Sequence, residues 1–174
     1  MRETTGYDHS WRRAPRKNSR MLSFQAVPME QEPAWSLAQA MRDEMADLYD
    51  GLVMDAPDMP KAGPEELGPP AGVFLVGFDE EGAPLCCGGV KDLGDGACEI
   101  KRMYVVPEGR RSGRAGELLL ALEEAARGLG YSVARLDTGP RQPHAERFYR
   151  VAGYAPIADF NRNPVATFFG EKAL

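Results

Sequence analysis

The chain reads Arg110-Arg111-Ser112-Gly113-Arg114-Ala115-Gly116 where a strand-like stretch gives way to a long helical one. The first turn of a helix exposes backbone N–H groups and the positive end of its dipole, so it attracts anions. Gly113 lets a ligand approach the backbone, and small Ala115 and Gly116 keep the entrance open. The three arginines add positive charge. These features predict an anion cradle suited to a pyrophosphate. The alternative is a solvated loop that only caps the helix.

The segments on either side of this turn predict a parallel strand pair. Residues 98–106 are strand-like, and the helix that begins near Arg114 buries a stripe of leucines and alanines until glycines end it at 128–130. A second strand follows over 132–137. A strand, a helix and a strand within about forty residues indicate parallel strands joined by a right-handed crossover.

The remaining sequence predicts further strands and two more helices. We expect helices at 34–52 and from Pro143 to Gly153, and a Pro/Gly-rich loop at 55–71 that lies as a mobile lip over a site. The other predicted strands are 21–27, 73–78, 84–90, 154–157 and 165–170. The fold expected is α/β, with a mixed sheet that is antiparallel except for its central parallel pair and has helices on both faces.

Composition narrows the class of protein. A chain of 174 residues, 43% hydrophobic, suits one domain, and no apolar run is long enough to span a membrane. The formal net charge is −5, which disfavours general binding to nucleic acid. Three cysteines and two histidines form no zinc-type pattern or disulfide framework, so we expect no metal site and a cytoplasmic location. Residues 1–20 are basic and read as a disordered tail, although translation starting at Met21 is an alternative.

Two motifs resemble the GNAT family of N-acetyltransferases. Val105-Val106-Pro107 followed by Arg110-x-x-Gly113-x-Ala115 is similar to the family's acetyl-CoA signature, Gln/Arg-x-x-Gly-x-Gly/Ala after the fourth strand. About forty residues on, the stretch 145–154 is similar to the second motif, a helix that ends in Tyr-x-x-x-Gly-Phe/Tyr. The stretch 163–172 is similar to the last strand of many small bacterial members. The resemblance covers Met21 to Leu174, and it implies that residues 21–174 are an N-acetyltransferase domain.

The resemblance implies acetyl-CoA as co-substrate and a set of residues that bind it. The fourth and fifth strands would separate, and pantetheine would pair with the exposed backbone of the fourth strand like an added strand. The pyrophosphate would rest on the amides from Arg111 to Gly116, and Gln142 would contact pantetheine. The binding residues implied are Met103, Tyr104, Val105, Arg110, Arg111, Ser112, Gly113, Arg114, Ala115, Gly116 and Gln142.

Catalytic roles are implied for three residues. In the family, the tyrosine that aligns with Tyr149 protonates the departing thiolate; the alternative is that Tyr149 only joins the core stripe of its helix. Glu99 and Asp137 are both candidates for the base that accepts the amine's proton. Either is alternatively a strand-end carboxylate paired with a neighbouring cation such as Lys101.

The reaction implied is transfer of an acetyl group to a primary amine of a small molecule by direct attack. The alternatives are a peptide or protein N-acetyltransferase and a non-catalytic acyl-CoA sensor. The acidic segment 21–100 hints at a cationic acceptor such as a polyamine, an aminoglycoside or a lysine-bearing peptide. The sequence leaves the acceptor unnamed, and the resemblance leaves a homodimer open.

Overall fold

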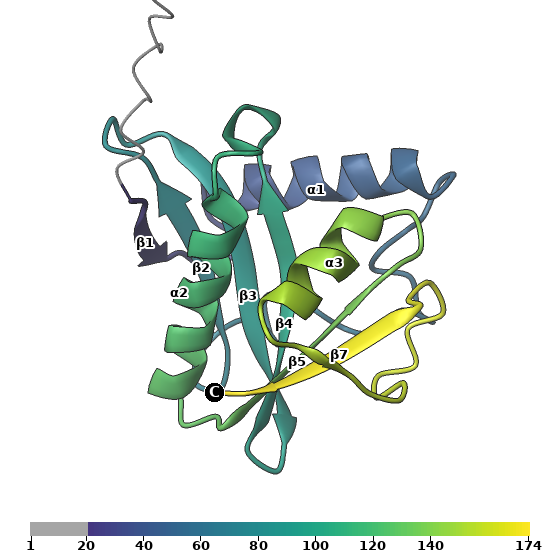
Figure 1. The fold of residues 1–174 in the computed structure, drawn as a ribbon. Coiled ribbons are helices and arrows are strands. Elements are labelled where there is room, and N and C mark those ends of the chain that lie inside the picture. The colour runs from purple at the N-terminus through teal and green to yellow at the C-terminus, as the bar shows by residue number, and fades with distance from the viewer. Residues whose placement is uncertain (1–20) are drawn as a thin grey trace, which may run out of the picture.

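A seven-stranded sheet runs through residues 21–174, the part of the chain that the computed structural model describes (Figure 1). The predicted tail at 1–20 lies outside the described residues. The strand order is β1-β2-β3-β4-β5-β7-β6, and only β4 and β5 run parallel, which confirms the predicted mixed sheet. The strands are β1 (Ser23–Ala26), β2 (Val73–Phe78), β3 (Pro84–Gly94), β4 (Ala97–Val105), β5 (Val133–Thr138), β6 (Ala155–Pro156) and β7 (Phe168–Ala173).

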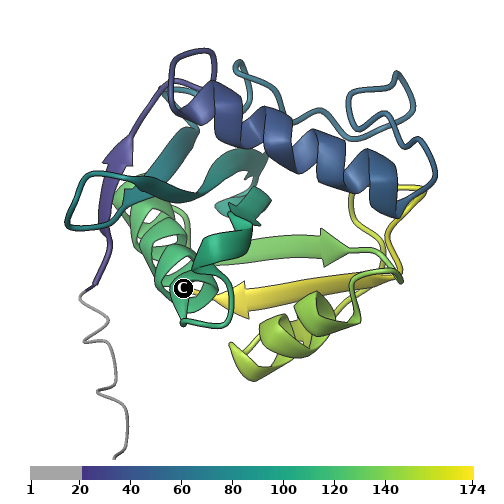
Figure 2. The same ribbon diagram turned by 90° about the horizontal axis from the view of Figure 1, so that it is seen from above.

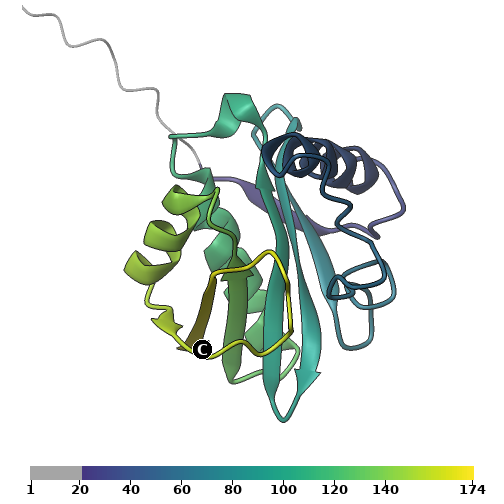
Figure 3. The same ribbon diagram turned by 90° about the vertical axis from the view of Figure 1, so that its right-hand side faces the viewer.

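Helices cover both faces of the sheet (Figure 3). α1 (Ala34–Leu48) packs on one face over a core that includes Phe74, Val76 and Tyr104. α2 (Arg114–Gly128) and α3 (Pro143–Val151) lie on the other face, where the leucine stripe of α2 meets β3, β4 and β5. A short 3-10 turn, η1 (Pro107–Gly109), connects β4 to the loop before α2.

Three predicted boundaries are wrong. The strand expected over 84–90 continues to Gly94. The helix expected over 34–52 ends at Leu48, because Asp50 and Gly51 adopt left-handed backbone with φ of 55° and 94°. The last strand, expected at 165–170, runs over Phe168–Ala173 instead. The residues before it form turns in which the side chain of Asn163 accepts from the backbone N–H of Val165 at 3.1 Å.

β4 and β5 separate along their length, as the resemblance implied. Their parallel pairing includes only Ala97↔Val133, Cys98↔Ala134 and Glu99↔Arg135, although both strands continue beyond these residues. A bulge in β4 accompanies the separation: Cys87 pairs with Tyr104 and Gly89 with Lys101, so Arg102 and Met103 both lie opposite Gly88. Figure 2 shows β5 beside β7, with α1 and α3 on opposite sides of the sheet.

Candidate active site

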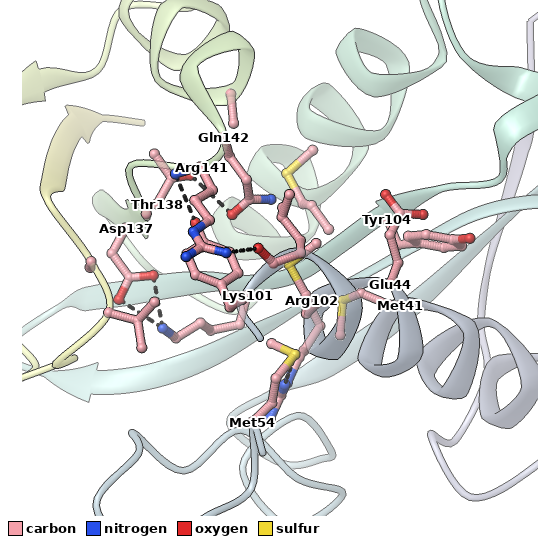
Figure 4. Close-up of a pocket in the computed structure, with 18 of the residues that line it drawn as sticks. Met41, Glu44, Met54, Lys101, Arg102, Tyr104, Asp137, Thr138, Arg141 and Gln142 are labelled. Carbon is pink, nitrogen blue, oxygen red and sulfur yellow. Dashed lines mark hydrogen bonds and ion pairs between the residues drawn. The ribbon is translucent and has the colours of Figure 1, made fainter. Parts of the chain in front are cut away.

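A pocket of about 460 Å³ opens where β4 and β5 separate (Figure 4). Its walls come from α1, the loop after it, the second half of β4, the end of β5 and the start of α3. Ligands of open α/β sheets bind in the same place, beyond the carboxyl ends of parallel strands. The predicted site residues that line this pocket are Met103, Tyr104, Val105, Arg110, Asp137, Gln142 and Tyr149.

The turn before α2 is open to a ligand. Gly113 takes φ of 86° and precedes the first residue of α2, and Arg111 also has a positive φ, of 60°. A Cβ added at Gly113 or Gly116 would meet nothing within 4 Å. The Ser112 hydroxyl donates to the Gly109 carbonyl at 2.6 Å, and no side chain caps the helix by a hydrogen bond. The start of α2 thus has the features of an anion site among the described residues.

Arg110 is held in the pocket wall. Its Nε donates to the Val105 carbonyl at 2.9 Å, and its Nη2 pairs with Glu44 of α1 at 2.5 Å. The guanidinium lies 5.6 Å from the centre of the Tyr104 ring. These contacts join α1 to the end of β4 and occupy one carbonyl of the strand that was expected to pair with pantetheine. A contact between Arg110 and a phosphate of acetyl-CoA stays a prediction. In the structure, the Arg110 side chain links α1 to the end of β4.

Tyr149 lies on α3, and its side chain contacts β4. Its hydroxyl donates to the Met103 sulfur at 3.5 Å, and its ring packs 6.0 Å from that of Tyr154. Burial first, and then the charge of Asp137, raise the pKa of Tyr149 above its ordinary value of 10.0. The phenol therefore keeps its proton at neutral pH. Tyr149 packs against the core and also lines the pocket, so the two alternatives for this residue are compatible.

Glu99 and Asp137 belong to one polar cluster. Lys101 Nζ lies between them, 2.9 Å from Glu99 Oε1 and 2.9 Å from Asp137 Oδ2. Asn161 Nδ2 donates to the same two oxygens at 2.6 Å each, and Asn163 Nδ2 donates to Asp137 Oδ2 at 3.0 Å. The ion pairing anticipated as an alternative is therefore present. Only Asp137 of the two carboxylates lines the pocket, while Glu99 is fully buried.

Sequence reasoning missed Asn161 and Asn163. The run Asn161-Arg162-Asn163-Pro164 is typical of turns, and nothing in it points to Asp137, which is some 24 residues away along the chain. The antiparallel pairing of β5 with β7 places the turn before β7 beside the end of β5. Those two asparagines then complete the shell of hydrogen bonds around Asp137.

Arg102 was also missed, and it corrects the expectation for loop 55–71. Its buried side chain donates from Nη2 to Asp55 at 2.6 Å, from Nη1 to the Met54 sulfur at 3.2 Å and from Nε to the Ala62 carbonyl at 3.3 Å. Leu67 in the same loop is 1% exposed. The loop lines the pocket, as a lip would, but these contacts anchor it to β4 instead of leaving it loose.

The open mixed sheet, the separated parallel strands and the glycine turn into α2 define an acyl-CoA N-acyltransferase fold. The chain matches the Acetyltransferase (GNAT) family model over residues 30–154, so it belongs to that family, which uses acetyl-CoA. No helix within residues 21–174 is long and apolar enough to cross a membrane, and the same residues hold no cluster of three His, Cys, Asp or Glu fit for a metal.

Similar proteins fit this family assignment. An uncharacterised N-acetyltransferase of Schizosaccharomyces pombe is 37% identical over 101 residues, which is 58% of this chain and 62% of that protein. An IAA acetyltransferase of Azospirillum brasilense is 34% identical over 105 residues, covering 58% of this chain and 67% of that protein. The chain thus matches less than two thirds of the length of the first relative and about two thirds of the second.

Solved structures share the fold. The acyl-CoA N-acyltransferase of Klebsiella pneumoniae superposes with a TM-score of 0.70 at 25% identity, covering 88% of this chain and 98% of that one. A PaiA N-acetyltransferase of Thermoplasma acidophilum, solved with coenzyme A, gives a TM-score of 0.63 at 15% identity, covering 89% and 100%. At that lower identity the likeness concerns the fold alone.

Proposed function

We propose that the protein is an N-acetyltransferase that moves an acetyl group from acetyl-CoA to a primary amine of a small molecule by direct attack. The observation that carries the proposal is the position of the Tyr149 hydroxyl, 3.5 Å from the Met103 sulfur in the wall of the pocket. Family membership, the open turn before α2 and the separated β4 and β5 support it.

The described residues fit acetyl-CoA. The pyrophosphate would rest on the turn from Arg111 to Gly116, where added side-chain atoms at the glycines meet open space. The pantetheine arm would lie along Met103 and Tyr104, on the edge of β4 that has lost its pairing with β5. Gln142, which precedes α3 and lines the pocket, would donate or accept a hydrogen bond from its amide.

Tyr149 would act as the general acid. A thiol leaves as a thiolate with a pKa near ~8.5, so a protonated phenol beside it can donate a proton as the thioester breaks. The raised pKa of Tyr149 keeps the phenol protonated at neutral pH but makes it a weaker acid, so the position of the hydroxyl, and not its pKa, supports this role. Backbone N–H groups of β4 would stabilise the oxyanion.

Asp137 is the stronger of the two candidate bases. A substrate ammonium with a pKa near ~10.4 must lose its proton before attack, at about 4–5 kcal/mol near pH 7 if nothing assists it. Asp137 Oδ2 accepts from Lys101, Asn161 and Asn163, whereas Oδ1 accepts only from Lys101 at 3.1 Å among the described residues. Oδ1 thus retains a lone pair for the amine, and Glu99 would support the cluster from behind.

Two measurements test the proposal together. Titration calorimetry should detect acetyl-CoA binding, and a thiol assay should detect CoA release that depends on an added amine. Binding without turnover for any amine or peptide would favour the sensor alternative. Turnover confined to lysine-bearing peptides would favour the peptide N-acetyltransferase.

A further inference from the structure

We infer that the acceptor is an amphipathic primary amine, with one ammonium group on an aliphatic or aryl-alkyl body. This inference deepens the proposed function and rests on it. Two independent features of the pocket carry it: the state of its charges and the composition of its apolar wall.

Each fully charged side chain in the pocket wall already has a partner of opposite charge. Glu44 pairs with Arg110 at 2.5 Å and Asp137 with Lys101 at 2.9 Å, both within the wall. The other two cations reach outward, Arg102 to Asp55 at 2.6 Å and Arg141 to Asp50 at 2.6 Å. The wall thus holds four cations and two anions, and Asp50 and Asp55 outside it pair with the two additional cations, so each anion of the wall already has a cationic partner.

A polyamine or an aminoglycoside would bring several ammonium groups into this wall. Only one of them can meet Asp137 Oδ1, and the others would lose water without gaining an anionic partner. Of the acidic residues between positions 21 and 100, only Glu44 lines the pocket, and Arg110 holds it. The other acidic residues of that segment are not part of the pocket wall, so the acidity on which the cationic-acceptor hypothesis depended is not concentrated in the site.

Methionine dominates the apolar part of the wall. Besides Met103, which is assigned to the pantetheine arm, four of the eight methionines of the chain line the pocket, from α1 and the loop after it: Met41, Met45, Met54 and Met59. Leu48, Leu52 and Val165 extend the same surface. Methionine is unbranched and polarisable, so it moulds to apolar groups of varied shape. Arg102 anchors the backbone of the loop that carries Met54 and Met59. The flexible methionine side chains, and not movement of the loop, would therefore let the wall fit different apolar groups.

The test compares hexylamine and 2-phenylethylamine with spermidine, kanamycin and a lysine-bearing peptide. We expect kcat/KM at least tenfold higher for the apolar amines than for any of the others, and a dissociation constant at least tenfold lower in calorimetry. Amine binding is titrated with and without CoA, so the comparison is decided even if no turnover occurs. Equal or better binding or turnover of spermidine, kanamycin or the peptide overturns the inference, as does binding of no amine.

A pair of variants locates the selectivity. Met59→Asp places an unpaired carboxylate in the pocket wall and should lower kcat/KM for hexylamine about tenfold while improving that for spermidine. Val53→Asp is the matched control, because Val53 is 65% exposed in the same loop and does not line the pocket. If both variants change selectivity alike, the wall does not select the amine and the inference fails. If calorimetry detects no binding of CoA to the wild-type protein, the proposed function is refuted instead.

Discussion

The Tyr149 hydroxyl on α3 donates to the Met103 sulfur on β4 at 3.5 Å, across the gap that opens where β4 leaves β5. The two residues are separated by 46 positions in the sequence, and the β4-α2-β5-α3 connection brings them together. A thioether is a weak acceptor, so a better-placed acceptor in the pocket can take this proton at little cost. The contact leaves the phenol ready to donate.

Tyr149→Phe should lower kcat about 10²-fold with little change in the affinity for acetyl-CoA, because it removes the proton donor and keeps the ring. Amine-dependent CoA release and calorimetry measure the two quantities. Tyr131→Phe is the control, since the Tyr131 hydroxyl donates to the Ala71 carbonyl away from the pocket. An unchanged kcat in Tyr149→Phe would remove Tyr149 from the mechanism.

Gly113→Glu should abolish measurable acetyl-CoA binding without unfolding the protein. The new carboxylate would occupy and charge the space in front of the turn, which is open at present. Gly82→Glu is a matched control, because Gly82 has nearly the same φ, 83° against 86°, equally open surroundings and a place in the distant β2–β3 turn. Both variants carry the same backbone penalty, of about 1 kcal/mol. Similar affinity in the two would refute the cradle.

Asp137→Asn should lower kcat about 10²-fold near pH 7, since an amide cannot accept the amine's proton. Glu99→Gln should affect the stability of the fold more than kcat, because Glu99 is buried behind the cluster and outside the pocket wall. Thermal unfolding and amine-dependent CoA release measure the two effects. The reverse pattern would make Glu99 the base.

Arg102→Ala should destabilise the fold by about 2–4 kcal/mol, since it removes two contacts with loop 55–71 and one with Met54 just before it. Arg102→Gly removes the same contacts and should be about 1 kcal/mol less destabilising, because residue 102 has φ of 58°. Urea unfolding compares the pair. If Arg102→Gly is less stable than Arg102→Ala, the left-handed backbone at residue 102 is not a source of strain.

Stability should fall as pH rises above about 9. Burial raises the pKa of Cys86 to about 11 and of Cys98 to about 12, so both thiols stay protonated in the folded state. In the unfolded chain they ionise near pH ~8.5. The unfolded state then binds fewer protons, and each thiol lowers the free energy of unfolding by about 1.4 kcal/mol per pH unit between these values.

Urea unfolding of the wild type and of Cys98→Val from pH 8 to 11 checks this slope. The variant should lose stability less steeply, because one of the titrating thiols is gone. Parallel curves would show that Cys98 ionises equally in the folded and unfolded states.

Local patterns in the sequence were enough to predict most of the fold. The leucine stripe of α2, the glycines that end it and the alternating strands around it depend on neighbours within a few residues. The same holds for the turn at Gly113, whose positive φ is a property of that position. Errors appeared where tertiary contacts decide, as at the start of β7, which depends on its pairing with β5.

The sequence by itself determined the elements, the parallel pair and the glycine turn, because each follows from short-range periodicity and backbone preference. Only the tertiary structure decided that Lys101 lies between Glu99 and Asp137, that Asn161 and Asn163 complete their shell, and that Arg102 anchors the loop. Except for the contact between Lys101 and nearby Glu99, these contacts join residues that are 24 to 62 positions apart in the sequence. Such pairs form only when the packed sheet brings their side chains within hydrogen-bonding distance, which no local pattern encodes.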